Sequence, residues 1–268
     1  MSRYDHYQHL AIKVQDKVAT VTLNRPDVRN AMNRLMIREL HAIWRDLADD
    51  RDVNAVLLTG AGNYFSVGGD VKAMSSRPGG DFRDADEPYD PAVGRRLLLN
   101  LLELDKPVIC AINGDAVGLA ATVALFSDVT VMSEAARVGD THVRVGLVAG
   151  DGGAVIWPML VGMSRAKEFL MRGTLLSGRD AEKLGLVNYT LPADQVLGKA
   201  QEIAQELANG ATWAIRWTKL AMNQALKQRL ILIQPAASAL EHATMEMNDH
   251  REATVAFKEK RKPKFTGT

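Results

Sequence analysis

The stretch from Arg137 to Pro158 holds the residue types in this chain best suited to proton chemistry. It reads RVGDTHVRVGLVAGDGGAVIWP and places His142 and Asp151 in one glycine-rich segment. Histidine titrates near neutral pH and serves as acid or base. A carboxylate in a buried glycine-rich turn can have its pKa raised by desolvation or lowered by backbone N–H donors. The pattern therefore favours a catalytic loop in which His142, Asp151 or both transfer protons.

Each of these side chains also has a purely structural interpretation. His142 fits a half-buried histidine whose ring nitrogens are satisfied by neighbouring groups. Asp151 is a good turn residue, and a good N-cap for a helix that begins in GGAVIWPML. Asp140 is close enough in sequence to orient His142, although we favour a turn aspartate at the end of a strand.

Two further glycine-bearing turns, FSVGGD at 65–70 and NGDAVGLAAT at 113–122, each separate an expected strand from an expected helix. The first backbone N–H groups of a helix lack intrahelical acceptors, and glycine lets a ligand approach the backbone closely. Two such N–H groups directed at one carbonyl oxygen form an oxyanion hole, which stabilises an enolate or a tetrahedral intermediate. Taken singly, such turns are more often structural.

The elements that must position these residues alternate between strands and helices up to about residue 190 and are helical afterwards. Residues 75–94 are rich in Gly, Pro and Asp and have no periodicity, which is typical of a functional or disordered loop. The expected elements are a hairpin at 10–23, a helix capped by Asn30, a strand at 54–60, a helix at 95–104, a strand–turn–helix–strand unit at 106–134, helices at 164–172 and 178–184, a strand at 186–192, and C-terminal helices at 193–209, 211–226, 234–248 and 250–263.

Composition narrows the class of protein. The chain has 268 residues, 47% hydrophobic and 24% charged, with a net charge of +1, so no basic excess indicates nucleic-acid binding. The single cysteine, Cys110, lies in an apolar run and is expected in the core. We find no signal peptide and no apolar window long enough for a membrane span, and expect a cytoplasmic protein. The remaining histidines lack metal-ligand spacing, so no metal is expected.

Several motifs together resemble one family, in order and spacing from about residue 8 to 265: YFSVGGDVKAM, PVICAINGDAVGLA, VGLVAGDGG with the segment that follows it, and FKEKRKPKF. The chain is similar to the crotonase (enoyl-CoA hydratase/isomerase) superfamily. The resemblance implies an α/β superhelix of repeated ββα units over 1–195 and a C-terminal helical trimerisation region over 196–268. It also implies an acyl-CoA thioester ligand, no cofactor beyond the CoA moiety of the substrate, and a homotrimer or a dimer of trimers.

The resemblance also implies roles for single positions. The oxyanion-hole amides are those of Val67 and Leu119, although the family usually has glycine at the second position. Arg25 and Arg29 are implied phosphate contacts, with a solvated surface charge as the alternative. Lys260 and Lys262 are weaker candidates for a phosphate contact across a subunit boundary. The adenine site is implied to be lined by the backbones of Val28, Ala31, Ser66, Gly68 and Asp70, with Lys72 nearby.

This chain departs from the family where hydratases carry their two catalytic glutamates, because Thr122 and His142 stand at those positions. A threonine hydroxyl is not a base at neutral pH, so two-glutamate hydration is not expected. A β-diketone hydrolase branch of the oxocamphor-hydrolase type carries histidine and aspartate at the positions of His142 and Asp151. That branch has a second histidine where this chain has Ala120, so the match is partial.

These observations predict an enoyl-CoA hydratase/isomerase-type enzyme that acts on an acyl-CoA thioester through an enolate stabilised by an oxyanion hole. Two alternatives stay open. One is a hydrolase of a β-dicarbonyl or acyl-CoA substrate. The other is a CoA-ester binding protein that has lost catalysis, which the missing glutamates favour and the pair of His142 and Asp151 argues against.

Overall fold

The computed structural model describes residues 3–71 and 92–268. Lys72 lies outside the described residues. So does the loop expected at 75–94, except for its last three residues, which begin a helix that was expected to start at residue 95. That helix, α3, covers Ala92–Glu103.

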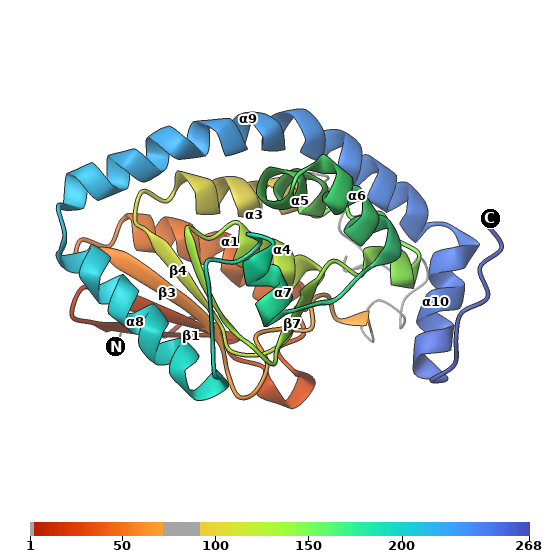
Figure 1. The fold of residues 1–268 in the computed structure, drawn as a ribbon, viewed down its shortest axis with the longest axis horizontal. Helices are drawn as coiled ribbons and strands as arrows, with labels where there is room; N and C mark the ends of the chain where they lie inside the picture. The colour runs from red at the N-terminus through yellow and green to blue at the C-terminus, as the bar shows by residue number, and fades with distance from the viewer. Residues whose placement is uncertain (1–2, 72–91) are drawn as a thin grey trace.

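The elements follow the expected alternation of strands and helices along the chain (Figure 1). The strands are β1 (Leu10–Gln15), β2 (Val18–Leu23), β3 (Ala55–Gly60), β4 (Val108–Ile112), β5 (Ala116–Val117), β6 (Val129–Ser133), β7 (Arg137–Gly139), β8 (Leu176–Ser177) and β9 (Tyr189–Leu191). The helices are η1 (Pro26–Val28), α1 (Arg34–Ala48), α3 (Ala92–Glu103), α4 (Leu119–Leu125), η2 (His142–Val145), α5 (Gly153–Val161), α6 (Met163–Arg172), α7 (Gly178–Lys183), α8 (Ala193–Asn209), α9 (Thr212–Met245) and α10 (Asn248–Lys258).

Two sheets organise these elements. The larger is six-stranded in the order β1-β2-β3-β4-β6-β9, and the smaller is three-stranded in the order β5-β7-β8. The hairpin of β1 and β2 is antiparallel, and every later pairing in the larger sheet is parallel. In the smaller sheet β5 pairs with β7 in parallel, so the turn before α4 lies beside the end of β7. This pairing brings two of the sequence-predicted site segments together.

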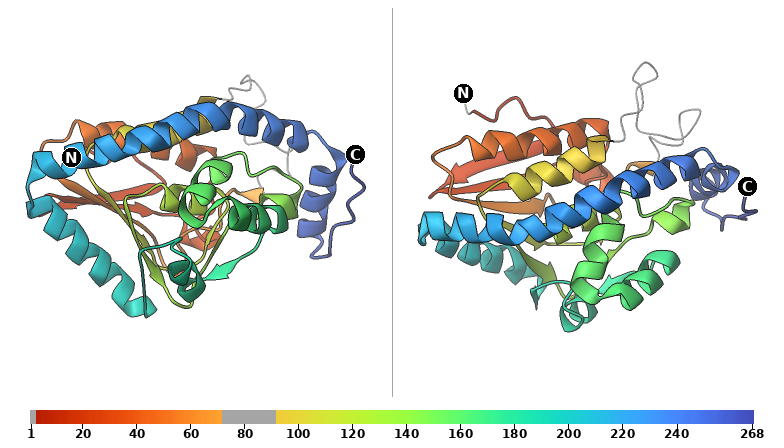
Figure 2. Two further views of the ribbon diagram at one scale, coloured as in Figure 1. Left: turned by 45° about the horizontal axis from the view of Figure 1, so that its top comes forward. Right: turned by 90° about the horizontal axis from the view of Figure 1, so that it is seen from above.

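The larger sheet is covered on both faces, which explains why its central strands are continuously apolar. Side chains alternate across the sheet: Val56 and Leu58 of β3 join the main core. Leu57 of β3 points the other way, into a second cluster with Ala200 and Ala204 of α8. In the left view of Figure 2, α8 lies on one side of the larger sheet and α1, α3 and α9 lie on the opposite side.

Cys110 of β4 is fully buried, as expected, and burial raises the pKa of its thiol.

One local prediction was wrong at the start of α1. Asn33, and not Asn30, is the N-cap, with its side chain accepting a hydrogen bond from the Met36 N–H at 3.0 Å. Asn30 is instead fully buried with a left-handed backbone, φ 54°. Its amide donates to three backbone carbonyls, including that of Tyr64 at 2.9 Å. Asn30 therefore ties the loop after β2 to the turn after β3.

The C-terminal helical stretch also differs from expectation. Two helices expected around residues 211–226 and 234–248 form one helix, α9, which continues through Pro235. Figures 1 and 2 show α9 running along the molecule above α3 and α5. Over the described residues, no helix is both long and apolar enough to cross a bilayer. The boundary expected near residue 195 stays a prediction.

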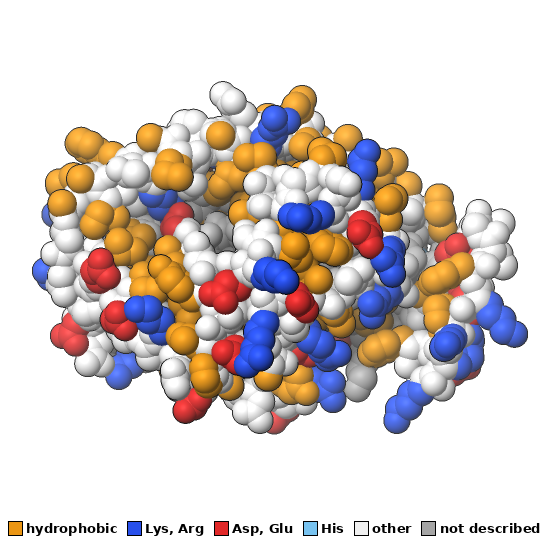
Figure 3. All heavy atoms as spheres, viewed as in Figure 1, with side chains coloured by type: hydrophobic (Ala, Val, Ile, Leu, Met, Phe, Trp, Pro, Cys, Tyr) orange, Lys and Arg blue, Asp and Glu red, His pale blue; other side chains and the backbone are white. Residues whose placement is uncertain are grey.

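Hydrophobic side chains lie exposed along α9, and Figure 3 shows such side chains over the top of the molecule where this helix runs. Trp213 and Trp217 are about 60% exposed, with ring centroids 5.5 Å apart. The other large hydrophobic residues exposed on α9 are Met222, Ile231, Leu232 and Leu240.

Candidate active site

The two turns predicted to form an oxyanion hole lie against each other. Ser66 and Ala116 form a parallel β-bridge, and the Val117 N–H donates to the Ser66 carbonyl at 3.1 Å. A Cβ on Gly68 would lie 2.3 Å from the Val117 carbonyl oxygen, so only glycine permits this approach. Val67 follows Ser66 and Leu119 follows Gly118, so both residues lie next to the contact between the two turns.

The two predicted amides differ in their present partners. Leu119 is the first residue of α4, so its N–H has no acceptor within the helix. The Val67 N–H donates to the Arg29 carbonyl at 3.2 Å. A thioester oxygen would have to replace that carbonyl before Val67 could stabilise an oxyanion. The oxyanion-hole role of both amides stays a prediction.

His142 follows β7 and lies beside the turn that contains Gly118. A Cβ on Gly118 would lie 3.6 Å from Cε1 of the His142 ring. Asp140 accepts the His142 backbone N–H at 3.2 Å, so it is a turn aspartate, as favoured. Its Oδ1 also lies 2.6 Å from His142 Nδ1. Asp140 therefore orients the imidazole as well, which the sequence interpretation had ranked second.

The other ring nitrogen of His142 faces two carboxyl groups. Nε2 lies 3.4 Å from Oδ2 of Asp151 and 3.7 Å from Oε1 of Glu241. Thr122, which the sequence resemblance places where hydratases carry a glutamate, donates its hydroxyl to Asp151 Oδ1 at 3.0 Å. His142, Asp151 and Glu241 are 12–14% exposed in their side chains, and Asp140 is 1% exposed. We call these four side chains the acid–base cluster.

Burial and charge shift the pKa values of this cluster. Burial acts to lower the pKa of His142, but the carboxylates of Asp140 and Asp151 outweigh it and raise that pKa well above 6.5. Burial raises the pKa of Asp151 despite the opposing charge of His142. Burial also raises the pKa of Glu241, to about 8. The raised pKa values of His142 and Glu241 favour the protonated forms of these two groups, and Asp151 is the carboxyl that lies nearer to Nε2 of His142.

The glycines of the AGDGG loop make room for this cluster. A Cβ on Gly150 would lie 2.5 Å from Cβ of Glu241, and one on Gly153 would lie 2.2 Å from Oδ2 of Asp140. Gly152, not Asp151, occupies the N-cap position of α5. Asp151 Oδ1 nevertheless accepts the Gly153 N–H at 3.4 Å. The side chains of Glu241 and Asp140 lie so close to the backbone of this loop that residues larger than glycine would not fit at Gly150 and Gly153.

The loop implied to bind CoA is tied to the turn at 66–70 by hydrogen bonds from backbone and side-chain groups. The Met32 N–H donates to the Gly68 carbonyl at 2.8 Å, and the Ser66 hydroxyl donates to the Asn30 carbonyl at 2.7 Å. The structure thus brings Ala31, Ser66, Gly68 and Asp70 together, with Val28 exposed at the edge.

The two arginines implied to contact phosphate have different surroundings. Arg25 already bonds the Ala31 carbonyl and lies 3.2 Å from Asp70 Oδ2. Arg29 is exposed, with its guanidinium carbon 5.2 Å from the centre of the Tyr64 ring. Arg29 is therefore the better placed of the two for an incoming phosphate.

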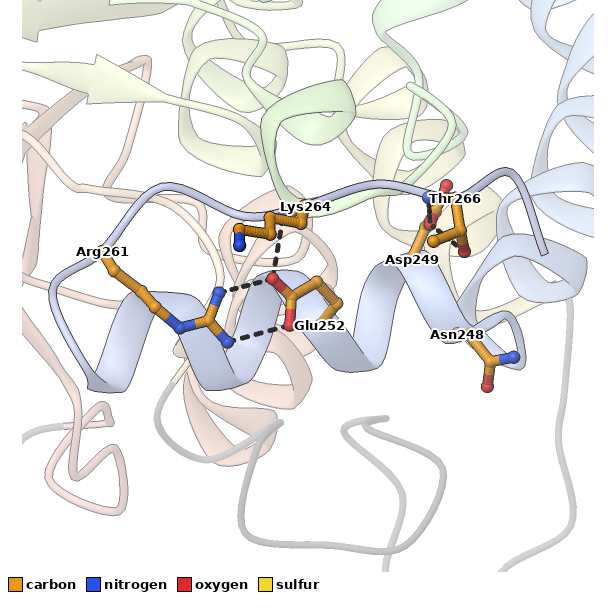
Figure 4. Close-up of a pocket in the computed structure, with 6 residues that line it drawn as sticks. All are labelled: Asn248, Asp249, Glu252, Arg261, Lys264 and Thr266. Atoms are coloured by element: carbon orange, nitrogen blue, oxygen red, sulfur yellow. Dashed lines mark hydrogen bonds and ion pairs between the residues drawn. The ribbon is translucent and has the colours of Figure 1, made fainter.

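A separate pocket lies between α10 and the C-terminal tail (Figure 4). Arg261 donates to Glu252 through two nitrogens there, and Lys264 donates its backbone N–H to the same carboxylate at 2.7 Å. The pairing holds the pKa of Glu252 low, at about 2. Lys260 and Lys262 are exposed on this tail. The pocket is lined by Asn248, Asp249, Glu252, Arg261, Lys264 and Thr266.

Among the described residues, Asp140, His142 and Asp151 form one group whose possible metal-ligand atoms all lie within 4.8 Å of one another. The two carboxylates, however, contact opposite nitrogens of the ring. A single ion bound to one ring nitrogen would lose one of the carboxylates unless the group rearranged. The absence of a resident metal stays a prediction.

Sequence reasoning missed Glu241. This residue lies in SALEHATM, the last eight residues of α9, which has no glycine, no motif and no histidine spacing to mark it. Its only local sign would have been the helical phase that it shares with Gln234 and Ser238, at spacings of seven and three residues. That phase identifies one face of the helix but not what the face contacts.

Comparisons with known proteins agree with this geometry. The sequence profile of the family described as enoyl-CoA hydratase/isomerase matches residues 13–268. Two relatives are a short-chain-enoyl-CoA hydratase from Clostridium acetobutylicum, 31% identical, and a 1,2-epoxyphenylacetyl-CoA isomerase from Escherichia coli, 32% identical. Each alignment spans 95% of this chain, and 96% and 97% of the respective relative.

Solved structures extend the likeness to three dimensions. An enoyl-CoA hydratase/isomerase from Mycobacterium paratuberculosis superposes with a TM-score of 0.86 at 32% identity, over 94% of this chain and 99% of the other. An enoyl-CoA hydratase/isomerase from Pseudoalteromonas atlantica gives 0.87 at 27% identity, over 97% of this chain and 100% of the other. The crotonase-type α/β fold expected from the motifs is thereby confirmed, and the chain belongs to the enoyl-CoA hydratase/isomerase family.

Proposed function

We propose that this protein is an enzyme that acts on an acyl-CoA thioester by moving a proton next to the thioester carbonyl. The family and the relatives named for enoyl-CoA hydration and isomerisation support a CoA thioester as the substrate. The acid–base cluster supports proton transfer as the chemistry. An isomerase-type reaction fits better than two-glutamate hydration, because Thr122 and His142 replace both glutamates.

One observation carries this proposal. The His142 ring lies beside Gly118, whose next residue supplies a predicted oxyanion amide, and its Nε2 faces Asp151. A carbonyl oxygen held at the Val67 and Leu119 amides would leave its α-carbon directed at this cluster. Asp151 removes a proton from the substrate carbon, and the electron pair moves onto the thioester oxygen. His142 or Glu241 returns a proton to carbon. The proton on Asp151 then passes to His142, or through His142 to Glu241, and this transfer restores the starting state of the enzyme.

Hydrolysis is the second candidate, and the pairing of Asp140 with His142 favours it. With Nδ1 held at 2.6 Å by a buried carboxylate, His142 has the orientation of a histidine that activates water. Water would then add to a carbonyl carbon of a β-dicarbonyl or acyl-CoA substrate. The partial match to the β-diketone hydrolase branch agrees with this chemistry.

Product analysis separates these functions. The protein is incubated with short and medium 2-enoyl-CoAs and with 3-oxoacyl-CoAs, and products are followed by mass spectrometry for wild type and Asp151→Asn. Isomerised or hydrated CoA esters from wild type alone support the proposal. Free acid or a product of C–C cleavage supports hydrolysis. Calorimetric binding without any turnover identifies a CoA-ester binding protein, and the absence of binding contradicts the acyl-CoA proposal itself.

We further propose that the protein assembles as a homotrimer or a dimer of trimers, as the family resemblance implies. We also propose that it is located in the cytoplasm. The exposed hydrophobic side chains of α9 support an interface on this helix, because so large an apolar surface on one helix is uncommon in a monomer. Light scattering coupled to size-exclusion chromatography tests the assembly. A molar mass near 29 kDa, the mass of one chain, would contradict it.

A further inference from the structure

Gln234 of α9 is buried against the loop that carries Asp151. It is 1% exposed, and its amide nitrogen donates to the Gly150 carbonyl at 2.5 Å. The same nitrogen lies 3.1 Å from the Ser238 hydroxyl, which in turn donates to the Gly150 carbonyl at 3.3 Å. Two side chains from one face of α9 therefore converge on a single backbone oxygen.

That oxygen belongs to the peptide unit that ends at the nitrogen of Asp151. Because a peptide unit is planar, fixing the Gly150 carbonyl fixes the direction of the Asp151 N–H and limits the directions open to its side chain. Gly150 also touches α9 directly, since an added Cβ would lie 2.6 Å from the Ala237 carbonyl oxygen. The loop therefore rests on α9 and cannot shift toward it.

We propose that Gln234 is a positioning residue, which acts through the Gly150 carbonyl to hold the carboxylate of Asp151 against His142 Nε2. The expected effect of Gln234 on turnover rests on the proposed function. Its effect on the acid–base cluster rests on the geometry alone. Ser238 supplies the second, weaker donor. Displacement of the Asp151 carboxylate slows proton transfer much more than it weakens substrate binding, because catalysis depends on the placement of the reacting groups.

The test compares Gln234→Met with Gln224→Met. The first substitution keeps volume and helix propensity and removes the donor. The second makes the same change on an exposed part of α9, where Gln224 donates to the Leu220 carbonyl of its own helix. For Gln234→Met we expect kcat on a CoA ester to fall tenfold or more with KM changed less than about twofold. Gln224→Met should match wild type in both constants.

A second readout needs no substrate. The His142 ring is followed by ¹⁵N NMR across pH, with its resonance assigned from His142→Gln. Weaker contact with Asp151 in Gln234→Met should lower the titration midpoint of His142 by about one unit. If wild type turns over no CoA ester, the proposed function fails while this titration still decides the positioning role. A Gln234→Met protein with an unchanged His142 midpoint, and only a lowered melting temperature, would overturn the proposal.

Ser238→Ala covers the case in which Gln234→Met does not fold. It removes the weaker of the two donors to Gly150 and leaves Gln234 in place. The expected result is a smaller shift of the His142 midpoint in the same direction. An unchanged midpoint in Ser238→Ala would then count against the proposal.

Discussion

The two sides of the candidate site are built in different ways. The side implied to bind CoA, the loop at 25–32 with the turn at 66–70, is joined by backbone hydrogen bonds such as Met32 N–H to Gly68 carbonyl at 2.8 Å, to which the Asn30 and Ser66 side chains add. The acid–base cluster is held by side chains from the end of β7, the AGDGG loop and α9. A site built from backbone tolerates changes of side chain, whereas a buried charge cluster does not.

This difference bears on how the chain compares with its family. The sequence resemblance places Thr122 at the position of one hydratase glutamate, and Asp151 accepts the Thr122 hydroxyl at 3.0 Å. It places His142 at the position of the other, where Asp140 lies at one ring nitrogen and Asp151 and Glu241 lie near the other. On this prediction the acid–base groups differ from those of a hydratase as a set, while the oxyanion-hole role predicted for Val67 and Leu119 stays the same.

The largest effect should come from His142→Gln, which keeps polarity and removes the titrating ring. General acid–base groups contribute about 10²- to 10⁴-fold, so kcat should fall by that factor on any substrate turned over. Calorimetric affinity for an unreactive CoA thioester should stay within about twofold, because the CoA side is separate. Full activity in His142→Gln would contradict the claim that the acid–base cluster carries the chemistry and the CoA side carries the binding.

Glu241→Gln should change the dependence of stability on pH. Glu241 has a folded pKa of about 8 against 4.5 for an ordinary glutamate, so between these values the folded state holds a proton that the unfolded chain releases. The free energy of unfolding of wild type should therefore fall, relative to the variant, as pH rises from about 4.5 to about 8. We expect a relative loss on the order of 2 kcal/mol, less than the isolated shift implies because His142 and Asp151 share the proton.

Urea unfolding of both proteins at several pH values measures this slope. Gln224→Met serves as the control for a substitution on α9 outside the cluster. Parallel stability curves for wild type and Glu241→Gln across this range would show that Glu241 does not hold the extra proton.

Arg29→Ala should weaken the CoA side without touching the cluster. Loss of one charge-assisted phosphate contact is worth about 1.5 kcal/mol, which corresponds to roughly a tenfold rise in KM, with kcat unchanged. The effect should shrink as ionic strength rises. Arg165→Ala, at an exposed arginine of α6, is the matched control. A fall in kcat with constant KM would place Arg29 on the catalytic side instead.

The smallest effect should come from Glu252→Gln on α10. Its ion pair with Arg261 is at the surface, where such pairs contribute little to stability. The variant should leave kcat and KM unchanged and should make the tail after residue 259 more sensitive to limited proteolysis. Loss of activity would instead connect the pocket of Figure 4 to the acid–base cluster.

Sequence reasoning succeeded where the signal was local. The strand–helix alternation follows from residue types at short spacing. The structure also brings the FSVGGD turn to the NGDAVGLAAT turn, and His142 to Asp151, while their catalytic roles stay predictions. It failed at Asn30, which has the residue type of an N-cap but is used to bridge two loops. Asparagine is favoured both as a helix N-cap and as a residue that bridges two loops, so only the packed structure distinguishes these two roles of Asn30.

The rest of the site could not be predicted because it depends on long-range packing. Glu241 reaches His142 only because α9 is one long helix across α3 and α5, and Pro235 made two helices the natural expectation. The glycines of AGDGG indicated a close approach but not the partner, which proved to be Asp140 and the Glu241 side chain. Pattern alone says which face of a helix is buried and not what covers it.

Hydrogen–deuterium exchange at the substrate α-carbon tests the central claim most directly. A saturated acyl-CoA is incubated in D₂O with wild type and with Asp151→Asn, and deuterium in the acyl chain is counted by mass spectrometry. Wild type should incorporate deuterium, and Asp151→Asn should do so at least about 100-fold more slowly, because the carboxylate that removes the proton is gone. Equal exchange by both proteins, or no exchange by a wild-type protein that binds the ester, would contradict this account.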